Sequence, residues 1–535
     1  MSERIEPSTL KSWLHDGDEI ALLDVREQGQ YGESHLFYGI PLPYSRLELD
    51  APRLLPRRSV RVVVYDSGEA DTDRVAERAA DRLKAIGYSD VHRLAGGTQA
   101  WRKAGHVLFA GVNLPSKTFG ELAEQVYHTP RVGADELAGM LASGNPVAVF
   151  DGRPLTEFKK MSIPGATCCP NGELGYRMRS LVPDPTVPIV INCAGRTRSI
   201  IGAQTLINLG LPNPVYALEN GTQGWYLADH ALEHGATKSY SPDSGTAQLQ
   251  PAAQALAQRF SVPTVNASTC ATWAADPART LFLCDVRTPK EFAAGTLPGA
   301  QHTPGGQLMQ ASDQYVGVRG ARLVLFDDDG VRAPTTASWL RQMGHEASVL
   351  AGGLASGFTL NAAEAPLPPP LQTITPQALA ELLTGGDVAV IDLRPGMQFR
   401  AGHIAEARWS IRPRLGGLLS EIAGARQIVL VSDEPALAAW AAASEWRADL
   451  PAPLLLEGSL PAWRTAGLPV ATSPDTPSDA DCIDYLFFVH DRHDGNKEAA
   501  RRYLAWETGL VAQLDADELA AFRLPAAAAA ADHRG

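Results

Sequence analysis

The chain carries the same three sequence motifs, in the same order, four times. The first motif is an apolar stretch that ends in Asp-x-Arg, and the second is another apolar stretch roughly 40 residues further on. The third is a glycine-containing turn that precedes a large aromatic residue. The aspartates of the four Asp-x-Arg motifs are Asp24, Asp151, Asp285 and Asp392. A long-period repeat of this kind indicates four tandem copies of one fold.

Each copy spans about 100 to 120 residues, which is the size of a domain with a core of its own. The strand-like stretches, such as IALLD and PIVIN, are apolar throughout, as is typical of a sheet that is buried on both faces. Helical patterns separate them, and we predict helices over residues 72–87 and 199–210, each stopped by a glycine. This alternation predicts the α/β class, with a parallel sheet flanked by helices in each domain.

The repeat also sets the expected domain boundaries. Proline-, alanine- and serine-rich stretches at 239–254 and 361–372 are interpreted as linkers, whereas the joint at 113–131 contains a helix-like piece and looks ordered. After residue 473 we expect a small, mostly helical C-terminal segment with a frayed, alanine-rich end. The predicted domains are 1–112, 128–236, 256–362 and 372–473, followed by a C-terminal extension at 474–535.

Charge, hydropathy and cysteine content restrict the partners and the location of the protein. The formal net charge of −13 argues against nucleic acid or an anionic membrane surface as the main partner. No apolar run approaches the ~20 residues of a membrane span, and the first residues lack the apolar core of a signal peptide. The six cysteines do not make a disulfide framework, and none has zinc-type CxxC spacing. We therefore expect a cytoplasmic protein without a metal site.

A cysteine ends the second apolar stretch of the second domain and opens a distinctive loop. The residues between this strand and the predicted helix are Cys193, Ala194, Gly195, Arg196, Thr197 and Arg198. A cysteine acts as a nucleophile in its thiolate form, which backbone N–H groups, a helix N-terminus and nearby arginines stabilise. The small residues Ala194 and Gly195 let the backbone curl tightly and let an anion approach. The pattern therefore predicts an anion cradle with a reactive thiolate at its floor.

These motifs together resemble those of rhodanese domains, the fold of a family of sulfurtransferases. The resemblance is carried by VFDGRPLTEFKKMSIPGA, CDVRTPKEFAAGTLPGA, LENGTQGW and the loop CAGRTRS, and it extends over about residues 5–473. It implies a tandem four-domain rhodanese-like protein with one active domain, the second.

The resemblance also implies a reaction in two steps. The Cys193 thiolate would attack the outer sulfur of an anionic donor such as thiosulfate, and the loop N–H groups would stabilise the resulting persulfide. Cyanide, a small thiol or a protein thiol would then take this sulfur, so a protein donor or acceptor is a further possible partner. Arg198, which closes the loop, and Arg196 would hold the donor. No cofactor is implied beyond the covalent persulfide on Cys193.

The other three domains depart from this pattern. Asp66 and Asp327 stand at or near the place of Cys193, and a Ser432-Asp-Glu sequence replaces the loop in the fourth domain. A carboxylate cannot carry a persulfide and repels an anionic donor. These loops also lack arginines in register with Arg196 and Arg198, since Arg74 and Arg332 are only the nearest cations. We interpret these domains as non-catalytic, with roles in packing against the second domain, shaping its entrance or binding a partner.

A few further residues of the second domain are weaker candidates. Glu173, Arg177 and Arg179 lie in a stretch, TCCPNGELGYRMRS, that runs near the pocket in the family, so they would face the substrate or form a solvated turn. Cys168 and Cys169 would either accept sulfur from Cys193 or lie in a buried strand, which is the simpler interpretation.

Two other patterns favour structural or solvent-exposed roles. Asp151 and Arg153 are interpreted as structural, because Asp-x-Arg persists in the domains that have no cysteine. His490 and His493 resemble part of a metal site, but a solvated loop accounts for them better.

Two alternatives to a thiosulfate-using sulfurtransferase stay open. The first is a persulfide carrier or scaffold, whose Cys193 accepts sulfur from a partner enzyme and rarely turns over thiosulfate. The second, a phosphatase or an arsenate reductase, is disfavoured because those cysteine enzymes of related design use a loop one residue longer.

Overall fold

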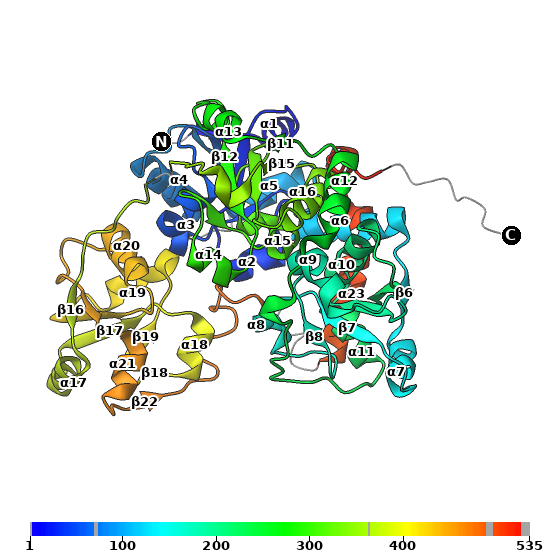
Figure 1. The fold of residues 1–535 in the computed structure, drawn as a ribbon. Helices are drawn as coiled ribbons and strands as arrows, with labels where there is room; N and C mark the ends of the chain where they lie inside the picture. The colour runs from blue at the N-terminus through cyan, green and yellow to red at the C-terminus, as the bar shows by residue number, and fades with distance from the viewer. Residues whose placement is uncertain (1–2, 69–72, 362–363, 488–495, 526–535) are drawn as a thin grey trace. The chain divides into compact units, whose positions relative to one another are not determined.

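The protein is described by a computed structural model that covers residues 3–68, 73–361, 364–487 and 496–525 (Figure 1). His490, His493 and the alanine run at 526–531 lie outside the described residues, so the expectations for them stay predictions. None of the helices in the covered ranges is both long and apolar enough to span a membrane.

The second domain shows how each copy is built. Its sheet has the strand order β6-β10-β9-β7-β8, and every neighbouring pair of strands is parallel. The strands are β6 (Arg131–Val132), β7 (Ala148–Asp151), β8 (Thr167–Cys168), β9 (Ile189–Asn192) and β10 (Val215–Leu218). The helices are α7 (Ala134–Ala142), α8 (Leu155–Phe158), α9 (Asn171–Leu181), α10 (Thr197–Asn208) and α11 (Gly221–Leu227). Ile191 and Leu206 lie in a core on one face of the sheet, and Val190 and Trp225 lie in a core on the other.

The other three domains repeat this topology. In each, the strands run in the order first, fifth, fourth, second, third across the sheet. The first domain comprises β1 (Glu3–Ile5), α1 (Pro7–Trp13), β2 (Ile20–Asp24), α2 (Gln28–Glu33), β3 (Ile40–Pro41), α3 (Leu47–Leu54), β4 (Arg61–Tyr65), α4 (Val75–Ala85), β5 (Val91–Leu94) and α5 (Gly97–Lys103). The helix α12 (Gln250–Arg259) lies between the second and third domains in the sequence. The third domain comprises β11 (Thr264–Val265), α13 (Ala267–Ala274), β12 (Leu281–Asp285), α14 (Pro289–Ala294), β13 (Gln301–His302), α15 (Gly305–Gln310), β14 (Arg322–Phe326), α16 (Arg332–Gln342) and β15 (Glu346–Leu350).

The fourth domain adds a small second sheet to the same plan. Its main elements are β16 (Gln372–Ile374), α17 (Pro376–Gly385), β17 (Val388–Asp392), α18 (Gly396–Ala401), β19 (Ala407–Trp409), α19 (Leu415–Glu421), β20 (Gln427–Val431), α20 (Pro435–Glu445), β21 (Leu454–Leu456) and α21 (Ser459–Thr465). The short strands β18 (His403–Ile404) and β22 (Val470–Ala471) pair in antiparallel fashion. The predicted α/β class with four parallel sheets is thus confirmed.

The chain divides into two compact units. One contains residues 1–12, 21–112 and 363–489, and so most of the first and fourth domains; the other contains residues 13–20, 113–362 and 490–535. The second unit therefore holds the second and third domains together with the C-terminal helices α23 (Lys497–Thr508) and α24 (Ala516–Ala520). The mostly helical C-terminal segment that the sequence predicts is confirmed.

The joints between domains are more structured than their composition suggests. As expected, the joint at 113–131 is ordered and contains the helix α6 (Leu114–Tyr127). The prediction of a linker at 239–254 is wrong in its second half, where α12 begins at Gln250. Leu249, Ala253 and Leu256 pack into the core of the second domain, because apolar residues at helical spacing bury their shared face.

Candidate active site

Cys193 is the first residue beyond the central strand of its sheet. β9 ends at Asn192 and α10 begins at Thr197, so Cys193 opens a short strand-to-helix loop. β9 lies beside β7, and the chain leaves these two strands toward opposite edges of the sheet. Parallel α/β folds place their ligand sites at such a switch point, outside the carboxyl ends of the strands. The topology therefore puts Cys193 where this class of fold binds and transforms its ligands.

The backbone of this loop is turned by the start of α11. The carbonyl of Cys193 accepts a hydrogen bond from the N–H of Thr222 (2.8 Å), and the carbonyl of Ala194 accepts one from the N–H of Gln223 (3.1 Å). A Cβ atom at Gly221, where φ is +54°, would lie 2.3 Å from the Cys193 carbonyl oxygen, so only glycine fits. The C=O and N–H of a trans peptide point in opposite directions. Because the carbonyls of Cys193 and Ala194 point toward α11, the N–H groups of Ala194 and Gly195 face away from it. Such a row of N–H groups can cradle an anion.

The thiol itself is buried and has a hydroxyl donor beside it. Cys193 is 2% exposed, and its Sγ lies 3.2 Å from Oγ of Ser199, in the first turn of α10. The Ser199 O–H can donate to the sulfur, and the N-terminus of α10 adds a partial positive charge. A hydroxyl donor and a helix N-terminus are groups that can interact with negative charge held in the loop.

Arg198 supplies a full positive charge near the thiol but is already paired. Its two Nη atoms donate to the two carboxylate oxygens of Glu157, on α8, at 2.8 and 2.7 Å. Burial acts to lower the pKa of Arg198, but Glu157 and, less strongly, Cys193 and Asp151 raise it, so that it lies above its ordinary value. The guanidinium therefore stays charged within the electrostatic field of Cys193.

Arg196 turns toward α6 instead. It donates to both oxygens of Glu121, at 2.7 and 3.0 Å, and also to Glu124 and Asn220. Burial raises the pKa of Glu121 above its ordinary value, although Arg196 opposes this shift. The two arginines expected to hold an anionic donor are thus both engaged by carboxylates in this structure.

Two of the weaker candidates on α9, Glu173 and Arg177, lie in a network that joins the second and third domains. Arg177 donates to Glu173 at 2.6 Å, and Arg332 of the third domain donates to the other oxygen of Glu173 at 3.1 Å. Arg177 also binds the carbonyl of Pro242. Arg179 is half-buried in the last turn of α9. The hydrogen bonds of Glu173 and Arg177 therefore serve domain packing, and a role in substrate binding stays a prediction.

The Asp-x-Arg motif forms the same clamp in every sheet. Asp151, at the end of β7, accepts from the backbone N–H and from two side-chain nitrogens of Arg153, which also donates to the carbonyl of Met161. The matching arginines donate to the carbonyl eight residues further on, at Ser34, Gly295 and Gly402. A buried pair with identical partners in all four domains is the behaviour of a structural element.

In two of the other loops an aspartate carboxylate accepts hydrogen bonds from backbone N–H groups of its own loop and the helix that follows. Asp66 and Asp327 directly follow β4 and β14, in the place of Cys193. The carboxylate of Asp66 accepts from the N–H groups of Gly68 and Ala76, and that of Asp327 accepts from those of Gly330 and Ala333. These N–H groups are therefore not available to an external anion.

The expectation that the third domain has no arginine in register with Arg198 is wrong. Arg332 is the first residue of α16 and lies five residues after Asp327, as Arg198 lies five after Cys193. Its Nη atoms bind both carboxylate oxygens of Glu291, at 2.8 Å each, as Arg198 binds Glu157. Asp329 adds a further pair to the Arg332 Nε, at 2.7 Å. The equal spacing is a signal for this equivalence, but the two loops look different in sequence because Asp328 and Asp329 stand where the active loop has small residues.

The fourth domain has neither a thiol nor a carboxylate at this position. Ser432 directly follows β20, and its Oγ accepts from the N–H of Glu434 and donates to the carbonyl of the same residue. The hydroxyl thus closes the loop on itself.

The two neighbouring cysteines of the second domain are buried. The Sγ of Cys168 donates to the carbonyl of Arg153 at 3.4 Å, and burial raises the pKa of Cys168 to about 12. Burial also raises the pKa of Cys169 well above its ordinary value. Both stay protonated near neutral pH, which disfavours them as nucleophiles.

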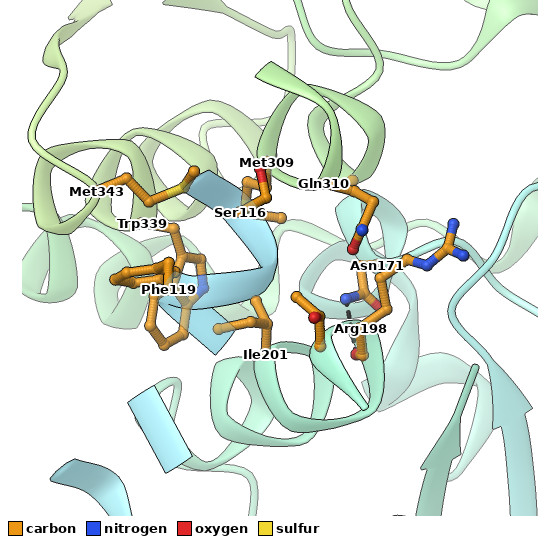
Figure 2. A pocket seen from close by; sticks show the side chains of 11 residues that line it. Ser116, Phe119, Asn171, Arg198, Ile201, Met309, Gln310, Trp339 and Met343 are labelled. Carbon is orange, nitrogen blue, oxygen red and sulfur yellow. Dashed lines mark hydrogen bonds between the residues drawn. The ribbon is translucent and has the colours of Figure 1, made fainter. Parts of the chain in front are cut away.

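A small pocket lies beside the loop, between helices of the second and third domains (Figure 2). Thr197, Arg198 and Ile201 line it from α10, Gln310 from α15 and Trp339 from α16. Figure 2 also shows the hydrogen bond from the Asn171 amide to the Arg198 carbonyl, 2.9 Å long. The cavity measures about 10 Å³, which is room for one water molecule and no more.

Some residues of the site were missed at the level of sequence. Glu157 had a signal, because the triplets Thr-Glu-Phe and Lys-Glu-Phe occupy matching places in the second and third domains. Ser199 lies within the motif that carried the resemblance, but no spacing singled it out. Across the described ranges, no group of three or more His, Cys, Asp or Glu is placed to hold a metal ion.

Comparison with known proteins identifies the fold. The family model described as Rhodanese-like domain matches residues 6–104, 133–228, 271–357 and 375–466. A crystal structure described as thiosulfate sulfurtransferase from Pseudomonas aeruginosa is 41% identical, with 97% of this chain and 99% of that chain covered and a TM-score of 0.89. The Synechocystis protein slr1261 is 31% identical over 101 residues, which are 19% of this chain and about half (52%) of that protein. The Alr3790 protein from Anabaena is 27% identical over 20% of this chain and 93% of that one, with a TM-score of 0.19. This chain belongs to the family of proteins built from rhodanese-like domains.

Proposed function

We propose that the protein is a sulfurtransferase that carries a sulfane sulfur as a persulfide on Cys193. The observation that supports this most directly is the contrast between equivalent loops. In the second domain a thiol stands at the floor of the cradle, with Ser199 and Arg198 beside it. In the first and third domains a carboxylate fills the same place. The Pseudomonas aeruginosa structure, described as a thiosulfate sulfurtransferase, adds support because its similarity extends over nearly the whole chain.

The proposed reaction has two displacement steps at sulfur. The Cys193 thiolate attacks the outer sulfur of thiosulfate, a new S–S bond forms, and sulfite leaves with the electron pair of the bond that breaks. The persulfide that results is held by the loop N–H groups and by the N-terminus of α10. An acceptor such as cyanide or a thiolate then attacks the terminal sulfur, and Cys193 leaves as the thiolate. The sulfur moves as a neutral atom, so no external oxidant or reductant is needed.

Mass spectrometry of the intact protein tests this proposal. Incubation with thiosulfate should add one sulfur, about 32 Da, and peptide mapping should place it on Cys193. The other five cysteines serve as internal controls, because peptide mapping of the same sample shows whether any of them takes up sulfur. Cys193→Ser should lose the adduct and the steady-state transfer of sulfur to cyanide. An adduct that survives this substitution would overturn the assignment of the site.

A second candidate is a persulfide carrier that accepts sulfur from a partner enzyme. Its support comes from the ion pairs of the loop, since Glu121 and Glu157 already engage Arg196 and Arg198. Paired arginines attract a dianion such as thiosulfate less strongly than free ones. Negligible thiosulfate turnover, together with rapid persulfidation of Cys193 by a cysteine desulfurase, would favour the carrier.

A further inference from the structure

The C-terminal helix α23 packs against the helices on either side of the active loop. It contacts α6 and α11, and the start of α11 is the element that turns the loop backbone. α23 covers residues Lys497–Thr508 and so lies beyond the last stretch that matches the family model, which ends at residue 466. The contacts described next therefore come from a segment outside the four domains.

Glu507 connects this helix to the loop by hydrogen bonds. It is 1% exposed, and its Oε1 accepts from the Oγ1 of Thr197 and from the Nζ of Lys117, both at 3.1 Å. Lys117, on α6, also donates to the hydroxyl of Tyr503. Thr197 is the first residue of α10 and the fifth of the loop, so Glu507 holds the point at which the loop becomes a helix.

The second carboxylate oxygen of Glu507 lies against Gly195. A Cβ atom at Gly195 would stand 2.8 Å from this Oε2 and 3.3 Å from the Cε1 of Tyr503. On its other side, the carbonyl of Gly195 lies so close to α11 that a Cβ at Gly221 would come within 2.7 Å of it. Gly195 is therefore enclosed from two sides. Glu507 cannot swing away freely, because Oε1 is bound and the side chain is buried.

Oε2 of Glu507 has no hydrogen-bond partner among the described residues. A buried carboxylate oxygen without a donor costs stability, so this contact is retained at an energetic disadvantage. Such a cost is more common where a side chain serves function than where it only packs.

We propose that Glu507 is a positioning residue of the active site, which fixes the loop backbone through Thr197 and through contact with Gly195. The inference rests on the proposed function, in which this backbone supplies the N–H groups for the Cys193 persulfide. α23 thus adds a contact from the C-terminal segment to a loop that belongs to the second domain.

The first test compares three substitutions on the same helix in the full-length protein. Glu507→Ala should lower kcat for sulfur transfer from thiosulfate to cyanide by about 10- to 100-fold, with a smaller change in KM, because the loop N–H groups lose their alignment. Glu507→Gln keeps an acceptor for Thr197 and should restore most of this loss. Glu498→Ala is the matched control, since Glu498 is 67% exposed and should leave kcat unchanged. A Glu507→Ala variant with wild-type kcat would overturn the proposal.

A double-mutant cycle provides a test that general destabilisation would not pass. Gly195→Ala should be strongly harmful in the wild-type background, because the new Cβ meets Glu507. Gly195 does not adopt a positive φ in the described backbone, so alanine is compatible with its conformation. In the Glu507→Ala background the same substitution should cost less, since only the 3.3 Å contact with Tyr503 remains, and this makes the two effects non-additive. Additive losses would show that Glu507 does not constrain Gly195.

Hydrogen–deuterium exchange separates failure of this inference from failure of the proposed function. If the wild type forms no persulfide with any donor, the proposed function fails. Kinetic measurements then carry no information on whether Glu507 positions the loop. Exchange of a peptide that covers residues 193–199 needs no activity. It should become faster in Glu507→Ala, stay near wild type in Glu507→Gln and be unchanged in Glu498→Ala. Unchanged exchange in Glu507→Ala would overturn the positioning role whatever the reaction is.

Discussion

At the scale of single residues, the position directly after the fourth strand of each sheet decides whether an anion cradle is open. Asp327 places its own carboxylate there and accepts two backbone hydrogen bonds, from Gly330 and Ala333. Cys193 places a sulfur in the same position, and in the proposed reaction this sulfur takes up a second sulfur atom. One side chain thus converts a binding site for an external anion into a site that is filled internally.

The buried carboxylate of Asp327 leads to a prediction about pH. Burial and the neighbouring charge of Asp329 raise its pKa to about 6, against the opposing effects of the backbone N–H donors and Arg332. The pKa of Asp327 is therefore about 6 in the folded state and about 3.9 in the unfolded state. Because the folded state binds the proton more tightly, the contribution of this group to stability is fully present below about pH 3.9. It is lost as the pH rises through about 6. We expect the stability of the third domain in the wild type to fall, relative to Asp327→Asn, between about pH 4 and pH 6.

The measurement is the urea midpoint for unfolding of the third domain at several pH values. Hydrogen–deuterium exchange of peptides from this domain reports its unfolding. The asparagine side chain introduces a constant offset, because it lacks one acceptor oxygen, so the slope with pH is compared rather than the absolute midpoint. Asp276→Asn is the matched control, since hydrogen bonding to the N–H of Ala278 holds the pKa of Asp276 below its usual range. Parallel slopes for the wild type and Asp327→Asn would contradict the prediction.

At the scale of elements, local patterns predicted the regular parts of the fold and missed those that depend on distant partners. The helix expected at 72–87 is α4, Val75–Ala85, and the one expected at 199–210 is α10, Thr197–Asn208. The linker prediction at 239–254 failed because burial of Leu249 and Leu256 depends on a core that lies elsewhere in the sequence. Glu507 was missed for the same reason, since no motif connects it with Thr197, 310 residues away.

The helix α16 shows that elements of the third domain support the active loop of the second. Trp339 on α16 is fully buried, and its Nε1 donates to Oγ1 of Thr205, on α10, at 2.9 Å. Its ring makes edge contacts with Phe119 and Tyr127 of α6. α6 carries the carboxylate partners of Arg196, and α10 carries Arg198, so the packing of these two helices affects the geometry of the active loop.

Trp339→Ala should therefore destabilise the second unit by about 3–5 kcal/mol through the cavity it leaves. It should also slow persulfide formation at Cys193 by about threefold or more, because α10 loses a fixed contact. Persulfide formation is followed by mass spectrometry below the unfolding temperature of the variant. The control is Trp273→Ala on α13, which is half-buried and whose ring contacts Arg322 within the third domain. Equal effects of the two substitutions on Cys193 would argue against support through α16.

At the scale of the whole molecule, four copies of one fold differ in the loop that follows the fourth strand of each sheet. All four keep the strand order and the Asp-x-Arg clamp, which explains why the repeat could be read from the sequence. The third domain even keeps the arginine pair, as Arg332 with Glu291. It lacks the thiol and the small residues that follow it. In their place, Asp328 and Asp329 bind the side chain of Arg332. Asp329 also accepts hydrogen bonds from the backbone N–H groups of Val331 and Arg332.

This comparison predicts that the third domain can be made to accept sulfur. In a Cys193→Ala background, the combined substitutions Asp327→Cys, Asp328→Ala and Asp329→Gly should yield an adduct of about 32 Da with thiosulfate, on the introduced thiol. They remove three carboxylates, release the N–H groups that Asp327 and Asp329 occupy, and leave Arg332 with Glu291. Asp327→Cys alone, in the same background, is the control and should react poorly, because two carboxylates near a thiolate raise its energy by about 1–4 kcal/mol each. If the grafted domain keeps its urea midpoint but forms no adduct, the loop is not sufficient for sulfur transfer. Contacts from outside the domain, such as the one that Glu507 makes with Thr197 in the second domain, would then be needed as well.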